Sequence, residues 1–162
     1  MNAGFAETNL ENLIKKAVSS VLIPEDVKVS IALEDQPSNV MVNPFLLKRV
    51  VTNLVTNAIQ AMPTGGEMTI AVSEMRDSVT ISVNDSGVGI PKENLATLFK
   101  PFFTTKAKGQ GLGLVVCKRL IEAQGGAISV ISEEGKGSTF TVKVPTNRPR
   151  TGGGSTRIYD AS

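Results

Sequence analysis

The chain has 162 residues, which is the size of a single domain and enough to bury a hydrophobic core. Its 17 basic and 15 acidic residues leave a net charge of +2, which gives no sign of a nucleic-acid-binding surface. The sequence has no histidine, one cysteine and no apolar run near the roughly 20 residues that span a membrane. These features exclude an internal disulfide framework, a histidine-ligated metal and a resident catalytic histidine. They favour a cytoplasmic protein without direct membrane contact.

The spacing of apolar residues, with Asn and Pro residues at helix starts and Gly and Pro residues at helix ends, predicts the elements in chain order. Asn43 and Pro44 in particular are typical of a helix start. The predicted elements are a helix over 9–22, strands over 27–33 and 39–42, a helix over 44–62, strands over 67–75 and 78–84, a short helix over 91–98, a loop over 101–110, a helix over 111–124, and strands over 127–132 and 138–144.

Helices interleaved with adjacent strand pairs favour an α/β fold. We expect a two-layer sandwich in which about three helices cover one face of a mixed, mostly antiparallel five-stranded sheet. The expected domain covers residues 8–145. Residues 1–7 are interpreted as a connecting segment, and the polar, glycine-rich residues 146–162 as a disordered tail or an added expression segment.

A polar stripe interrupts the apolar helix predicted over 44–62. Arg49, Asn53, Asn57 and Gln60 are spaced by four, four and three residues, so they lie on one helical face. One interpretation is a solvated stripe, and the other is the lining of a pocket. The pocket interpretation has a chemical basis, because asparagine oxygens are suitable ligands for a magnesium ion that already carries phosphates and waters.

Two glycine-rich segments, DSGVGI over 85–90 and GQGLGL over 109–114, place glycines at alternate positions where a strand or loop meets a helix. Glycines there allow close approach of a ligand and leave backbone N–H groups for anions. A Walker A loop is excluded at Gly135-Lys136, because Val130 stands where its first glycine is required. GQGLGL is not a dinucleotide fingerprint, because Leu114 replaces the third glycine and no βαβ unit surrounds it.

Four segments follow one another along the chain in this order: NLVTNAIQAM, DSGVGI, LFKPFFTTK and GQGLGL. Together they resemble the N, G1, F and G2 boxes of the ATP-binding catalytic domain of sensor histidine kinases, members of the GHKL superfamily with the Bergerat fold. The resemblance covers residues 8–145 and implies ATP and Mg²⁺ as cofactors.

The resemblance also implies roles for individual residues. Asn57 matches the ligand of magnesium, Asn53 is expected to contact phosphate or the waters of the metal, and both are implied to be catalytic. Asp85 matches the acceptor of the adenine amino group, and Thr139 matches a residue of the adenine water network. Gln60 stands where a lysine is frequent in the family. A lysine in the loop over 101–110 is therefore expected to supply that positive charge to the phosphates instead. The remaining residues implied to bind ATP are Gly87, Gly89, Ile90, Phe99, Phe103, Lys106, Gly109, Gly111, Leu112, Gly113 and Leu114.

Related hydrolytic ATPases of the superfamily carry a glutamate four residues before the metal-binding asparagine, where it acts as a general base. Here that residue is Asn53, which cannot take a proton, so phosphoryl transfer to histidine is favoured over hydrolysis. Because the chain has no histidine, the acceptor is expected on a separate dimerisation domain of the same kinase, with a response regulator as an indirect partner. The protein is then cytoplasmic or the cytoplasmic part of a membrane-bound sensor. The alternatives are a degenerate, nucleotide-responsive binding module and a hydrolytic ATPase.

Overall fold

The computed structural model describes residues 4–33, 39–100 and 111–146 of the chain. Most of the predicted elements are present within one or two residues of their expected ends. In chain order the elements are β1 (Ala6–Asn9), α1 (Leu10–Ser19), β2 (Val27–Ala32), β3 (Asn39–Val42), α2 (Pro44–Gln60), β4 (Gly66–Glu74), β5 (Ser78–Asp85), α3 (Lys92–Leu95), α4 (Gly111–Ala123), β6 (Ala127–Glu133) and β7 (Gly137–Pro145).

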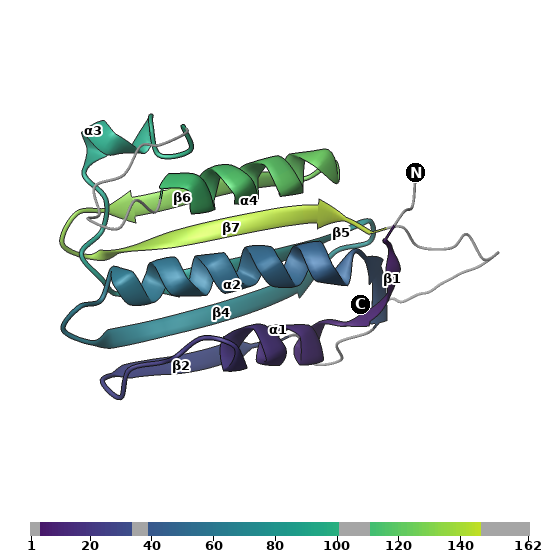
Figure 1. Cartoon of the computed structure of the whole chain (residues 1–162), viewed down its shortest axis with the longest axis horizontal. Coiled ribbons are helices and arrows are strands. Elements are labelled where there is room, and N and C mark those ends of the chain that lie inside the picture. The colour runs from purple at the N-terminus through teal and green to yellow at the C-terminus, as the bar shows by residue number, and fades with distance from the viewer. Residues whose placement is uncertain (1–3, 34–38, 101–110, 147–162) are drawn as a thin grey trace.

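The main sheet has five strands in the order β2-β4-β5-β7-β6. β2 and β4 are parallel, and every other neighbouring pair is antiparallel. Helices α1, α2 and α4 all lie over the same face of this sheet, with α2 in the middle (Figure 1). The predicted two-layer fold with a mixed, mostly antiparallel sheet is therefore confirmed.

A second, two-stranded sheet pairs β1 with β3 antiparallel, from Ala6 opposite Val42 to Asn9 opposite Asn39. β1 was not predicted, because residues 1–7 have the sequence of a connecting segment. Thr8 is buried in this strand, and Asn9 caps α1 by accepting a hydrogen bond from the N–H of Asn12 at 2.9 Å. The start of the domain is thus held by pairing to β3 as well as by the helix cap.

The central helix α2 begins as predicted. The Asn43 side chain accepts a hydrogen bond from the Leu46 N–H at 3.1 Å, and Pro44 takes the first helical position, where its missing N–H costs nothing. Val50, Val51 and Val55 are fully buried between the neighbouring helices and the sheet. This burial fixes the rotation of α2, so the direction of its polar stripe is fixed with it.

The inward face of the sheet is apolar, because its side chains alternate with polar ones along each strand. On β7, Phe140, Val142 and Val144 are buried, whereas Thr139 and Thr141 between them are not. The same alternation on β5 buries Ile81 and Val83. Among the described residues, no helix combines the length and apolarity needed to cross a membrane.

Candidate nucleotide-binding site

The polar stripe of α2 is exposed at both ends and most buried at Asn57. Arg49 and Gln60 are exposed at its ends, Asn53 is half-buried, and Asn57 is 8% exposed. Among the described residues, none is a hydrogen-bond partner of the Asn57 side chain. The Asn57 amide atoms still reach solvent, because Thr146 Oγ1 is the one fully buried side-chain polar atom without a partner among the described residues. The amide is therefore available for a ligand contact.

Asp85 is the other buried polar group of the predicted site. It is the last residue of β5 and is 3% exposed. Its Oδ1 accepts a hydrogen bond from the backbone N–H of Gly87 at 2.9 Å. This bond turns the chain back at the end of the strand and fixes the carboxylate at the edge of the helix-covered face.

The turn after Asp85 is attached to the end of α2, which brings the two buried groups to the same end of the domain. The Val88 N–H donates to the Ala61 carbonyl at 2.9 Å, and Ala61 lies one helical turn after Asn57. Gly87 allows this contact, because a Cβ atom there would lie 2.2 Å from the Ala61 carbonyl oxygen. In the structure the atom that approaches Gly87 closely is protein backbone, and the predicted approach of a ligand to this glycine stays a prediction.

The same turn is also attached to the hairpin between β6 and β7. The Gly135 N–H donates to the Val88 carbonyl at 2.7 Å, and the Ile90 N–H donates to Ser132 Oγ at 2.8 Å. Gly89 has a φ of 73°, and a Cβ atom there would lie 2.2 Å from the Glu133 carbonyl oxygen. A side chain at Gly89 would therefore separate the turn from the hairpin.

A depression of about 340 Å³ lies where this turn meets the end of the sheet, and Asp85, Ser132 and Ser138 are among the residues that line it. Ser138 pairs directly with Asp85 across β5 and β7, and it is 4% exposed. Asn84, Ile131 and Thr139 of the opposite face line the depression too, so it surrounds the end of the sheet beside the buried carboxylate.

Thr139, which is expected in the adenine water network, lies next to the residue that pairs with Asp85. Thr139 follows Ser138 on β7 and so projects from the opposite face of the sheet, where its Oγ1 accepts a hydrogen bond from the Asn84 side chain at 2.7 Å. Ser138, not Thr139, is on the face that carries Asp85. The alternation of Phe140, Val142 and Val144 along β7 already contained this information, because it places even-numbered residues inward.

The other predicted residues fall into three groups. Leu114 is buried in α4, and a Cβ atom on Gly113 would meet no described atom within 4 Å, so protein packing does not require that glycine. Phe99 packs edge-on against Phe140, with ring centroids 6.5 Å apart and an interplanar angle of 82°, and so contributes to the hydrophobic core.

Gly111 and Leu112 belong to α4, but their side chains are not described. Phe103, Lys106 and Gly109 lie outside the described residues.

Asn53 connects α2 with α4. Its Nδ2 donates to the sulfur of Cys117 at 3.5 Å, and the Cys117 thiol is buried. Burial raises the pKa of this thiol above its usual 9.0, while the hydrogen bond from Asn53 and the charge of Arg49 oppose the rise. The thiol is therefore neutral at physiological pH, and its sulfur accepts the hydrogen bond that positions the Asn53 amide.

The donor atoms available for a metal are few. Among the described residues, no cluster contains three or more histidine, cysteine or acidic side chains. A magnesium ion bound mainly by substrate phosphates and waters needs only one or two protein oxygens. The unpartnered Asn57 amide suits that requirement, because its oxygen is a neutral, hard ligand.

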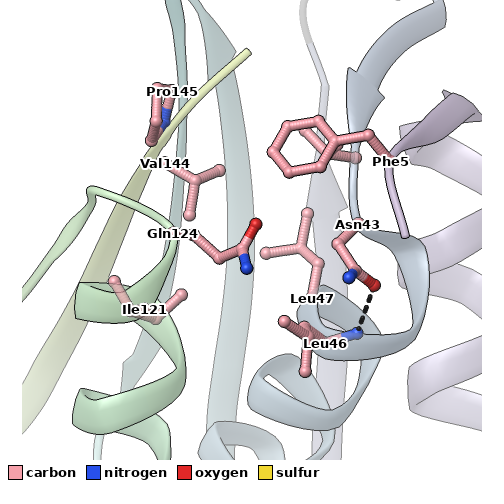
Figure 2. A pocket seen from close by; sticks show the side chains of 9 residues that line it. Phe5, Asn43, Leu46, Leu47, Ile121, Gln124, Val144 and Pro145 are labelled. Atoms are coloured by element: carbon pink, nitrogen blue, oxygen red, sulfur yellow. Dashed lines mark hydrogen bonds between the residues drawn. The ribbon is translucent and has the colours of Figure 1, made fainter. Parts of the chain in front are cut away.

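A second cavity lies at the opposite end of the helical layer and does not contain the predicted site. Figure 2 shows Leu47 of α2, Ile121 of α4 and Phe5 around it. Its volume is about 10 Å³, which is close to the minimum that holds one water molecule. It is therefore a packing gap between the start of α2 and the end of α4.

Comparison with known proteins identifies the class of this domain. The family model for histidine kinase-, DNA gyrase B- and HSP90-like ATPases matches residues 42–148. The chain belongs to this family, and its relatives identify it as an ATP-binding catalytic domain of the sensor histidine kinase type.

Two relatives illustrate the similarity. The chain is 43% identical over 125 residues to the sensor histidine kinase ZraS of Escherichia coli K12, a match that covers 77% of this chain and 27% of ZraS. It is 33% identical to the catalytic domain of histidine kinase ThkA, with a TM-score of 0.75, covering 87% of this chain and 95% of that domain. The chain thus spans about a quarter of the length of ZraS and nearly all of the ThkA catalytic domain.

A further structure contains histidine kinase ThkA in complex with the response regulator protein TrrA. The chain is 29% identical to this kinase, with a TM-score of 0.72, and the match covers 88% of the chain and 42% of the kinase.

Proposed function

We propose that this chain binds ATP with magnesium and donates the γ-phosphoryl group to a histidine on a separate dimerisation and phosphoacceptor domain of a two-component sensor kinase. The observation that carries the proposal is the placement of two buried polar groups at one end of the domain. Asn57 is 8% exposed and its amide has no partner among the described residues, and the turn that begins at Asp85 is bonded to the end of the same helix.

Asp85 is proposed to select adenine. A carboxylate has about four acceptor sites, and the Gly87 N–H uses one of them. The 6-amino group of adenine donates to such an acceptor, whereas guanine presents a carbonyl oxygen at that position. Ser138 beside Asp85 replaces Thr139 as the proposed hydroxyl contact on this side of the base.

The phosphates are proposed to lie between α2 and the start of α4. Backbone N–H groups at the start of α4, including those of Gly111 and Gly113, are suited to phosphate because they have no partner within the helix. Gln60 and Lys106 are proposed to contribute a polar and a positive group to phosphate binding. Asn57 is the residue that would hold magnesium, and the bound ion would neutralise charge on the transferring phosphoryl group.

The transfer step makes few demands on protein acid–base groups. A neutral imidazole nitrogen of the acceptor forms a bond to the γ-phosphorus, and the bond from that phosphorus to the bridging oxygen breaks, so ADP leaves with both electrons. Asn53 orients the phosphates by hydrogen bonding and cannot remove a proton from water. Positioning and charge neutralisation therefore account for the chemistry.

The partner follows from the composition. The chain has no histidine, so its phosphoryl group must go to another chain or another domain. The complex of ThkA with TrrA supports a response regulator as the downstream partner, which here is proposed to act after the histidine domain.

A mixing experiment tests the proposal. The chain is incubated with γ-labelled ATP and magnesium, alone and with a separately purified histidine-containing dimerisation domain. We expect label on the histidine domain only when both proteins are present, with slow phosphate release from the chain alone. Rapid phosphate release without the acceptor would contradict the proposal in favour of hydrolysis. ATP binding without any transfer would favour the nucleotide-responsive binding module instead.

A further inference from the structure

A row of three polar side chains crosses the end of the sheet that carries Asp85. Ser132 of β6 pairs with Ser138 of β7, and Ser138 pairs with Asp85 of β5. Ser138 and Asp85 are buried, and Ser132 is half-buried. Because directly opposite residues in antiparallel strands are close neighbours on one face, the row leads from the edge strand to the carboxylate.

The hydroxyl of Ser132 makes three hydrogen bonds. It accepts from the Ile90 N–H at 2.8 Å, it lies 3.0 Å from the Gly137 carbonyl oxygen, and it lies 2.7 Å from Ser138 Oγ. Serine has one hydroxyl proton and two acceptor lone pairs. Since the carbonyl can only accept, all three bonds form together when Ser132 donates to Gly137 and Ser138 donates to Ser132.

This arrangement makes the Ser138 hydroxyl an acceptor toward any further partner. Its single proton is used in the bond to Ser132, so any further partner of Ser138 has to be a donor. Ser138 and Asp85 then form two neighbouring acceptors at the depression beside the 85–90 turn. Two acceptors favour an amino group, directly or through a water, and disfavour a carbonyl oxygen at the same place.

We infer that Ser132 is a positioning residue for adenine selection: its hydroxyl holds the 85–90 turn through the Ile90 N–H and sets Ser138 as an acceptor beside Asp85. This inference rests on the proposed function, because it takes ATP as the ligand. Ser132 itself need not touch the base. Its effect is transmitted through one backbone N–H and one neighbouring hydroxyl.

The test compares two nucleotides that differ where the two acceptors would act. ATP carries a 6-amino group, and inosine triphosphate carries a carbonyl oxygen there. The affinity of the chain for each, with magnesium, is measured by titration calorimetry for the wild type, Ser132→Ala, Ser132→Thr and Ser138→Ala. The matched control is Ser129→Ala, an exposed serine on the same strand whose side chain lies on the opposite face.

We expect Ser132→Ala to reduce the ratio of ATP to inosine triphosphate affinity about ten-fold, since one oriented hydrogen bond is lost. Ser132→Thr keeps the hydroxyl and should retain the ratio, and Ser129→Ala should leave it unchanged. Adding Ser132→Ala to Ser138→Ala should cause no further loss of selectivity, because both changes break the same chain of bonds.

An unchanged ratio in Ser132→Ala, or equal losses of affinity for both nucleotides, would overturn the inference. If Ser132→Ala did not fold, Ser138→Ala would decide in the same way, because an unchanged ratio there excludes the acceptor role on which the inference depends. A wild-type chain that binds neither nucleotide, or binds both equally, contradicts the proposed function itself. The two failures are therefore distinguishable.

Discussion

Replacing Asp85 by asparagine isolates adenine recognition from folding. The variant keeps the shape of the side chain, and its amide oxygen can still accept the Gly87 N–H that now lies 2.9 Å from Asp85 Oδ1. The amide nitrogen then takes the place of the second carboxylate oxygen. It presents a donor to the adenine amino group, which is also a donor.

The magnitude follows from these bonds. Losing a hydrogen bond to a charged acceptor and leaving a donor unpaired costs about 3 kcal/mol together, which is roughly a 100-fold increase in the Kd for ATP. The bond that closes the turn remains in the variant, so the free energy of unfolding is measured beside the Kd to separate adenine recognition from stability.

The assay is calorimetric titration with ATP and magnesium, together with thermal unfolding monitored by circular dichroism. Asp77→Asn is the matched control, because Asp77 is an exposed aspartate in the turn between β4 and β5. The reasoning is refuted if Asp85→Asn binds ATP within about twofold of the wild type, which is the spread expected of a surface change.

Three further predictions concern the helical layer. Asn57→Ala should abolish the strengthening of ATP binding by magnesium and leave the melting temperature nearly unchanged, because its amide has no hydrogen bond to a described residue to lose. A normal magnesium effect in titration calorimetry would contradict this. Leu54→Asp should prevent folding by burying a charge in a position that is 1% exposed, so a native circular dichroism spectrum would be the contrary result. Cys117 has a pKa raised by burial, so its stabilising contribution is complete below the usual thiol pKa of 9.0 and is lost as the pH rises toward the higher folded-state pKa. Urea unfolding should therefore show a steeper loss of stability above pH 9.0 in the wild type than in Cys117→Ser, and equal slopes would show that the thiol is not the titrating group.

The sequence was sufficient for the elements whose signals are local. Asn43 and Pro44 start α2 as predicted, since a cap and a helix-starting proline act within a few residues. The missed strand β1 has four residues and depends on pairing with β3, more than thirty residues away. Its stability comes from that partner, so no pattern within 6–9 reveals it.

In the candidate site, too, local motifs identify residues, whereas contacts between distant segments cannot be predicted from them. Asp85 and Asn57 were identified from their motifs, and the structure places both of them in buried positions. The contacts that bring them to one end depend on pairing between distant segments, such as the Val88 N–H with Ala61 and the Ile90 N–H with Ser132. The alternation of buried residues along β7 determines which face each residue occupies, so the sequence pattern already places Ser138 on the face of Asp85 and Thr139 on the other face.

The central claim is that the end of the domain between Asn57 and Asp85 binds ATP together with magnesium. Titration calorimetry of the wild-type chain with ATP, once with magnesium and once with a chelator, tests it most directly. The account predicts binding in both conditions that is stronger with magnesium. No binding in either condition would contradict it.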